Sequence, residues 1–89
     1  MKYRGYAKRA DANESEIARA LVGIGCEVEK LTGSAGMPDL MVCLGSRLYL
    51  LEVKTDKGKP NADQMLFHHR FPVKVVRSID DALDAVTKQ

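Results

Sequence analysis

The sequence predicts an α/β domain in which helices flank a mixed central β-sheet, with the element order αβββαβα. Three observations support this class. Three segments carry apolar residues at a spacing of three and four, and each follows a residue that suits a helix N-cap. Four short apolar segments have the length and composition of strands, and glycine or proline separates the elements. With 89 residues and no repeat or linker, we expect one domain over 11–89, preceded by a basic arm over 1–10.

The first helix is expected from about Ala12 to about Val22, because an apolar stripe begins after a capping signal. Asp11 suits the N-cap, and Glu14 stands at the third helical position of a capping box. Glu14 is also in phase with the stripe, which places it at the edge of the core-facing side. Gly23 and Gly25 are expected to end the helix. The stripe comprises Ile17, Ala18, Leu21 and Ile24.

Three strands are expected next. Cys26–Leu31 alternates apolar and polar residues, which is typical of a strand at a sheet edge. Asp39–Leu44 and Arg47–Lys54 are apolar on both faces, and the two residues between them, Gly45 and Ser46, favour a β-hairpin at the centre of the sheet.

The last three elements have clear boundaries. Asn61 is expected to cap a helix of about ten residues, with Gln64 in the capping-box position and Pro72 ending it. Val73–Val76 has the composition of a fourth strand. Ser78 then caps a final helix, whose expected buried stripe is Ile79, Ala82, Leu83 and Val86.

Composition gives little information about function. Hydrophobic residues make up 45% and charged residues 29%, an ordinary balance for a globular protein. No apolar run is long enough to cross a bilayer, and the N-terminus lacks a signal-peptide segment, so we expect a cytoplasmic protein of a bacterial or phage-infected cell. Cys26 and Cys43 lack metal-ligand spacing and are expected to be reduced core thiols.

Basic residues are concentrated in two places, although the net charge is only +2. The opening MKYRGYAKR contains only basic charges, and Lys54, Lys57 and Lys59 form a second group. Such patches suit a polyanion, although ordinary solvated lysines explain them equally well. Tyr3 and Tyr6 in the arm could stack on bases or pack against a partner subunit.

The segment Gly36–Lys54 contains the main chemical signal. Leu48 and Leu50 alternate with Glu52 and Lys54, so this charged pair is expected to share a strand face with buried residues. Burying a charge is unfavourable unless it is paired or bound to a metal. The hairpin also brings the start of one strand beside the end of the next, which places Asp39 close to Glu52.

Two acids and a lysine in this arrangement suit hydrolysis of a phosphodiester. A divalent cation with oxygen ligands neutralises charge and activates water, and a lysine can hold that water and stabilise the transition state. The residues Pro38-Asp39 and Glu52-Val53-Lys54 match the PD-(D/E)XK nuclease signature.

The surrounding sequence extends the match. It includes Asn13-Glu14, Gly36-Met37 directly before Pro38, Gln64 in the second helix, and the closing VKVVRSIDDAL. From about residue 11 to residue 87 the chain resembles a small standalone VRR-NUC (virus-type replication-repair nuclease) domain, which implies a restriction-endonuclease-like αβββαβ core.

This resemblance implies a role for each matching residue. Asp39 and Glu52 would bind Mg²⁺ or Mn²⁺ with the Val53 carbonyl, and Glu14 would reach the metal directly or through water. Lys54 would position the attacking water. Gln64 would complete the catalytic set from the second helix. No organic cofactor and no membrane partner are implied.

Each of these residues also has a structural interpretation. Glu14 and Gln64 could be capping residues, Asp39 could cap the preceding loop, and Glu52 and Lys54 could be an ion pair at a strand end. His68 and His69 point about 100° apart on a helix, so we expect surface or DNA-facing roles for them instead of catalysis.

The sequence therefore predicts a metal-dependent endonuclease for branched DNA, similar to a Holliday-junction resolvase and active as a homodimer. Symmetric cutting by two related sites favours the dimer. Alternatives are a flap- or duplex-cutting nuclease of the same superfamily and a non-catalytic DNA-binding module. Phosphate contacts, which do not depend on base sequence, are expected from Lys57, Lys59, Arg47, Arg70, Lys8 and Arg9.

Overall fold

The computed structural model describes residues 12–88, and the element order is the predicted αβββαβα. The basic arm, with Tyr3, Tyr6, Lys8 and Arg9, and the expected cap Asp11 lie outside the described residues. The elements are α1 (Ala12–Gly23), β1 (Glu27–Lys30), β2 (Leu40–Leu44), β3 (Arg47–Val53), α2 (Ala62–Arg70), β4 (Val73–Val76) and α3 (Ile79–Thr87).

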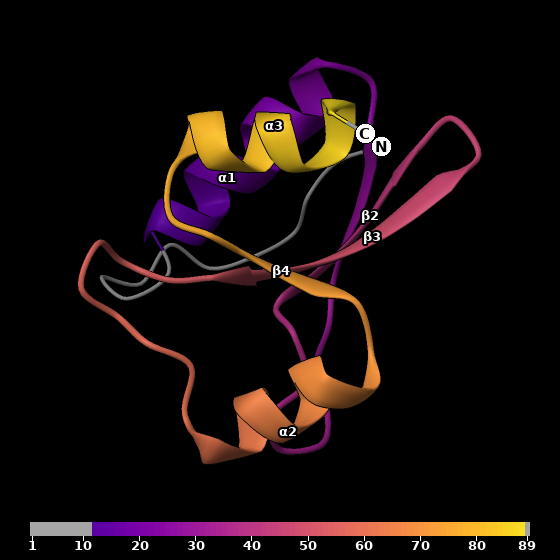
Figure 1. Cartoon of the computed structure of the whole chain (residues 1–89). Coiled ribbons are helices and arrows are strands. Elements are labelled where there is room, and N and C mark those ends of the chain that lie inside the picture. The colour runs from indigo at the N-terminus through magenta and orange to yellow at the C-terminus, as the bar shows by residue number, and fades with distance from the viewer. Residues whose placement is uncertain (1–11, 89) are drawn as a thin grey trace.

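The four strands form one mixed sheet in the order β1-β2-β3-β4 (Figure 1). The first three are antiparallel, and β4 runs parallel to β3. The hairpin of β2 and β3 is central and β1 lies at an edge, as predicted. Gly45 in its turn has a φ of 63°, a left-handed conformation that glycine adopts readily.

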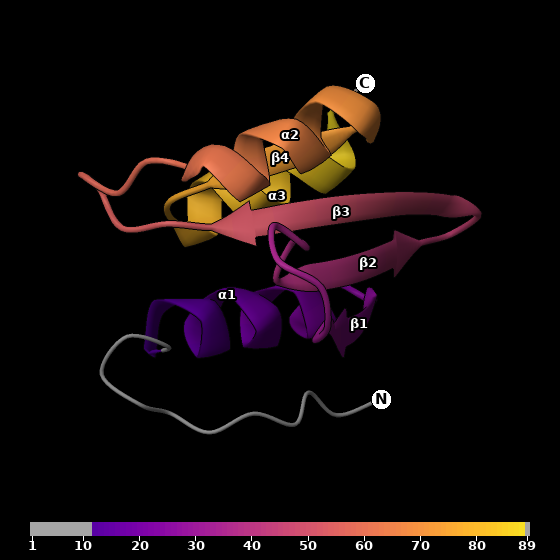
Figure 2. The same ribbon diagram turned by 90° about the horizontal axis from the view of Figure 1, so that it is seen from below.

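Helices cover the sheet unequally (Figures 1 and 2). α1 and α3 pack against each other on one face, α1 along β1 and α3 along β4, whereas α2 lies on the opposite side of the sheet. The apolar core lies between the sheet and the pair α1 and α3. Its fully buried members include Ile17, Leu21, Val28, Leu40, Val42, Leu51, Val76 and Ala82.

The prediction that Leu48 and Leu50 lie on the core face of β3 is wrong. Leu48 is 62% exposed and Leu50 is half-buried. The core face carries Leu51, which is fully buried, with Tyr49 and Val53 packed beside it. The reason is the distribution of helices: two helices cover the Leu51 face, and the nine-residue α2 shields the other face only in part.

Two residues at the ends of the predicted helical stripes are also more exposed than expected. Ile24 follows the end of α1 and is 44% exposed, and Ile79, the first residue of α3, is 39% exposed. Both lie at helix ends, where the sheet and the neighbouring helix cover side chains less completely. The remaining positions of the two stripes are buried or half-buried, as expected.

Local signals were reliable guides to the helix boundaries. Asn61 and Gln64 form a complete capping box at the start of α2, and Ser78 accepts a hydrogen bond from the backbone N–H of Asp81 at the start of α3. Cys26 and Cys43 are free thiols, and Cys26 lies in the core as predicted, whereas Cys43 is only half-buried. Among residues 12–88 no helix has the length and apolar content to span a membrane.

Candidate active site

Asp39 and Glu52 lie together because of the register of the hairpin. Leu40 pairs with Leu51, and the Asp39 N–H donates to the Leu51 carbonyl at 3.1 Å. The carboxylate of Asp39 then turns back to the neighbouring strand, where its Oδ2 accepts from the Val53 N–H at 2.8 Å. The two ends of β2 and β3 thus hold Asp39 beside the segment Glu52–Val53.

Glu52 is the most unusual side chain of the site, because it carries an ionisable carboxyl group and is only 2% exposed. Its Oε2 accepts from Nε2 of Gln64 at 3.2 Å and lies 3.8 Å from Nζ of Lys54. Its Oε1 is buried and has no hydrogen-bond partner among the described residues. One oxygen of a buried carboxylate is therefore held by the protein, and the other is unsatisfied.

The pKa of Glu52 is raised to about 8. Burial is the largest cause, followed by the adjacent carboxyl group of Asp39, while Lys54 acts in the opposite direction and Glu14 adds a further increase. Two acids crowded into a site with little solvent disfavour the doubly charged state. A bound cation would remove this cost.

Gln64 reaches Glu52 because the first turn of α2 packs against the loop before Asp39. Gly36 in that loop has a φ of 84°, and a Cβ at this position would overlap the Asp63 carbonyl group, 2.7 Å from its carbon. The Oε1 of Gln64 accepts from the Asn61 N–H at 2.9 Å while its Nε2 donates to Glu52. The capping and active-site interpretations of Gln64 are thus compatible.

Glu14 lies near the acids but does not join them in a ligand cluster. It is 5% exposed, and its Oε2 accepts from Nζ of Lys30 at 2.6 Å. Among residues 12–88 no three His, Cys, Asp or Glu side chains lie close enough to form a metal-binding group. Glu14 is therefore not grouped with Asp39 and Glu52 in this arrangement, although its charge acts on Glu52.

The predicted DNA-binding residues are distributed unevenly around these acids. Lys57 and Lys59 are exposed in the loop that follows β3, close to the site in the chain. Arg70 is exposed at the end of α2, with its guanidinium 5.0 Å from the ring centre of Phe71. Arg47 is not near the site: it begins β3 at the hairpin, about 17 Å from Glu52 at the usual strand rise.

Sequence reasoning missed several interacting residues. Lys30 was not expected to pair with Glu14, and Asn13 and Arg77 were not expected to hold the loop after Lys54. His68 was expected at the surface, but it is half-buried and its Nε2 lacks a hydrogen-bond partner among the described residues. A weak signal existed for His68, since it lies one helical turn after Gln64.

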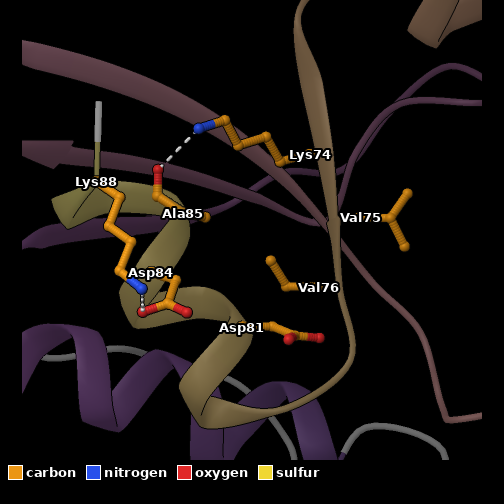
Figure 3. Close-up of a pocket in the computed structure, with 7 residues that line it drawn as sticks. All are labelled: Lys74, Val75, Val76, Asp81, Asp84, Ala85 and Lys88. Atoms are coloured by element: carbon orange, nitrogen blue, oxygen red, sulfur yellow. Dashed lines mark hydrogen bonds and ion pairs between the residues drawn. The ribbon is translucent and has the colours of Figure 1, made fainter.

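A hollow lies between β4 and α3, away from Asp39 and Glu52, and its charged groups are already engaged (Figure 3). Lys74 donates to the Ala85 carbonyl at 3.0 Å, and Lys88 pairs with Asp84 at 3.3 Å. Asp81 accepts from the Arg77 N–H at 2.9 Å. This hollow contains no buried, unsatisfied group among the described residues, so Asp39 and Glu52 mark the better candidate for chemistry.

The donor set at Asp39 and Glu52 fits a divalent cation. Carboxylate oxygens are the ligands that Mg²⁺ and Mn²⁺ prefer. The unsatisfied Oε1 of Glu52 and the raised pKa of this residue are both consistent with a site built to hold positive charge.

Comparison with known proteins gives one clear structural similarity. No family model matches the sequence, and no curated protein matches it either. A solved structure described as a VRR_NUC domain has a TM-score of 0.77 and 27% sequence identity, over 92% of this chain and 98% of that chain.

The mixed four-stranded sheet flanked by helices matches the restriction-endonuclease-like fold, and the similarity to a VRR_NUC domain implies a nuclease. The match covers nearly the whole described chain. This match supports its assignment as a VRR-NUC domain protein.

Proposed function

We propose that the protein is a metal-dependent DNA endonuclease in which Asp39, Glu52 and Lys54 form the catalytic centre. The observation that carries this proposal is Glu52, a buried carboxylate with one unsatisfied oxygen between Asp39 and Lys54. A purely structural ion pair would leave that oxygen unexplained, because buried polar atoms are nearly always satisfied.

The proposed metal is Mg²⁺ or Mn²⁺. Asp39, Glu52 and the Val53 carbonyl would hold it, with Glu14 contributing through water. When bound, such an ion neutralises phosphate charge and lowers the pKa of water. Gln64 holds the Oε2 of Glu52, so it orients this carboxylate toward the ion.

Lys54 has a separate role in this proposal. Its ammonium lies 3.8 Å from Glu52 and its side chain is 19% exposed, so it is anchored on one side and still open to solvent. From this position it would hold the attacking water and stabilise the negative charge that develops on the phosphate. Exposed Lys57 and Lys59 would bind neighbouring phosphates.

The proposed substrate is branched DNA, cut by a homodimer in the manner of a Holliday-junction resolvase. Support comes from the small size of the domain and from exposed apolar residues on the side of the sheet opposite the core. Leu66 of α2 is 66% exposed, and Leu48 of β3 is similarly exposed. A second copy of the chain would cover these residues.

Cleavage of end-labelled DNA tests the function. A four-way junction, a flap and a linear duplex would each be incubated with Mg²⁺, Mn²⁺ or a chelator. We expect metal-dependent, symmetric cuts in the junction and a loss of at least about 100-fold in rate for Asp39→Ala and Lys54→Ala. Asp84→Ala and Lys88→Ala, which alter an exposed acid–lysine pair, are matched controls that should retain full activity.

Two results would contradict parts of this proposal. Absence of cleavage of every substrate, with intact DNA binding, would overturn the enzyme assignment in favour of a binding module. Preferential cutting of flaps or linear duplex would retain the nuclease and remove the junction assignment.

The dimer is tested separately by light scattering coupled to size exclusion. We expect twice the monomer mass for the wild type and the monomer mass for Leu66→Glu. A monomeric wild type at micromolar concentration would refute the dimer.

A further inference from the structure

The guanidinium of Arg77 holds the loop that follows Lys54 through hydrogen bonds to backbone carbonyls. Nη1 of Arg77 donates to the carbonyls of Thr55 at 2.7 Å and Gly58 at 2.5 Å, and a longer contact reaches the Asp56 carbonyl at 3.5 Å. The Gly58 N–H closes the turn by donating to the Thr55 carbonyl at 3.1 Å. A single nitrogen atom thus contacts three backbone carbonyls of the loop.

Asn13 of α1 holds the same region from the other side. Its Nδ2 donates to the carbonyls of Lys54 and Arg77, each at 3.3 Å. The Lys54 N–H donates to the Val76 carbonyl at 3.0 Å. The backbone of Lys54 is therefore held on both sides, through its N–H by β4 and through its carbonyl by α1.

Arg77 is itself fixed in place. Its N–H donates to Oδ2 of Asp81 at 2.9 Å, and the Asp81 N–H donates to Oγ of Ser78 at 3.1 Å. The cap of α3 thereby anchors the residue that holds the loop after β3. Side chains from α1 and from the residue after β4 meet at the end of β3, and three segments that are distant in sequence are joined there.

We propose that Asn13 and Arg77 are positioning residues of the active site. Together they fix the turn over residues 54–58 and thereby hold the ammonium of Lys54 beside Glu52. Asn13 also precedes Glu14 in the chain, so the same contact sets the position of the third acid relative to β3. This inference rests on the proposed nuclease function.

A phosphate-binding role for Arg77 is the main competing explanation. Nη1 of Arg77 already donates to backbone carbonyls of the loop, and the residue is half-buried, whereas Lys57 and Lys59 nearby are exposed. The observed contacts therefore favour positioning. Lysine at this position would keep the positive charge but lose the planar guanidinium. A phosphate contact would therefore largely survive Arg77→Lys, whereas the hydrogen bonds to the loop carbonyls would be disrupted.

The test uses Arg77→Lys and Asn13→Asp in the full chain, with Arg19→Lys on the exposed face of α1 as the matched control. Asn13→Asp keeps the shape but puts an acceptor opposite two carbonyl oxygens. We expect kcat on the junction to fall about 10- to 100-fold for both variants, with KM and its salt dependence unchanged. Arg19→Lys should match the wild type.

Other results would overturn the proposal. Raised KM with a weaker salt dependence in an Arg77→Ala variant, together with full activity of Arg77→Lys, would show a phosphate contact. A lower Tm with unchanged kcat at a temperature where the variants are folded would show a role in stability alone.

A readout without DNA separates this inference from the nuclease proposal. Amide hydrogen exchange at Lys54 and Gly58 should accelerate at least about tenfold in Arg77→Lys and Asn13→Asp, and Mn²⁺ affinity measured by calorimetry should decrease. If the wild type cuts no DNA but these changes occur, the nuclease proposal fails and the positioning role remains. Unchanged exchange and unchanged affinity would refute the positioning role whatever the activity.

Discussion

The contact between Gly36 and α2 leads to a prediction whose size can be worked from the structure. In Gly36→Ala the new methyl would overlap the Asp63 carbonyl group, only 2.7 Å from its carbon and 3.2 Å from the backbone nitrogen of Gln64. The φ of 84° is also left-handed, which costs about 1–2 kcal/mol for a residue with a Cβ. Overpacking against a backbone adds about 1–3 kcal/mol.

The expected loss is therefore about 2–5 kcal/mol in the free energy of unfolding. A domain of this size has roughly 4–13 kcal/mol in total, so the variant should be strongly destabilised. Urea unfolding followed by circular dichroism measures the difference. Relief of the clash by movement of α2 would also separate Gln64 from Glu52, so cleavage by the folded fraction should fall.

Two glycines provide matched controls. Gly45 has a φ of 63°, but a Cβ added there would have no other atom within 4 Å, so Gly45→Ala should lose only the conformational part, about 1–2 kcal/mol. Gly23, at the end of α1, also has open space, and Gly23→Ala should be neutral or slightly stabilising. If Gly36→Ala loses no more stability than Gly45→Ala, the backbone contact does not matter and the reasoning is refuted.

Three further predictions concern the site and its surroundings. The pKa of Glu52 is about 8 in the folded protein, against an ordinary 4.5. As the pH rises, the unfolded chain therefore loses the carboxyl proton of Glu52 before the folded protein does. The free energy of unfolding of the metal-free protein should consequently fall from pH 4.5 to pH 8. Glu52→Gln should remove that decline in urea titrations and abolish cleavage, and an equal decline in the variant would contradict the assignment. Asn61→Ala should lose about 1 kcal/mol through the cap of α2, measured by urea unfolding, and a neutral result would contradict the role of the capping box. Burial raises the pKa of the Cys26 thiol, so iodoacetamide should label Cys43 first in the native protein, whereas equal labelling rates would contradict the burial of Cys26.

The local elements of this protein could be predicted because their signals are short in range. Caps at Asn61 and Ser78, the two-residue turn at Gly45, and the apolar strands depend on residues only a few positions apart. Hairpin geometry then required the start of β2 to meet the end of β3. The pairing of Asp39 with the end of β3 was thus predictable from chain order alone.

Tertiary packing decided which face of β3 became the core. The alternating sequence of β3 has apolar residues on both faces, so its periodicity could not distinguish the Leu51 face from the Leu48 face. The choice followed from the docking of α1 and α3 together on one side of the sheet (Figures 1 and 2).

The sequence by itself determined the order of elements and the positions of two acids and a lysine near one end of the central hairpin. Only the tertiary structure decided the partners of those groups: Lys30 for Glu14, Gln64 for Glu52, and Arg77 for the loop after Lys54. Each of these contacts joins residues 12 to 22 positions apart in the chain. Hydrogen bonds of that range depend on how whole elements pack, because no local periodicity encodes which side chains meet across a folded core.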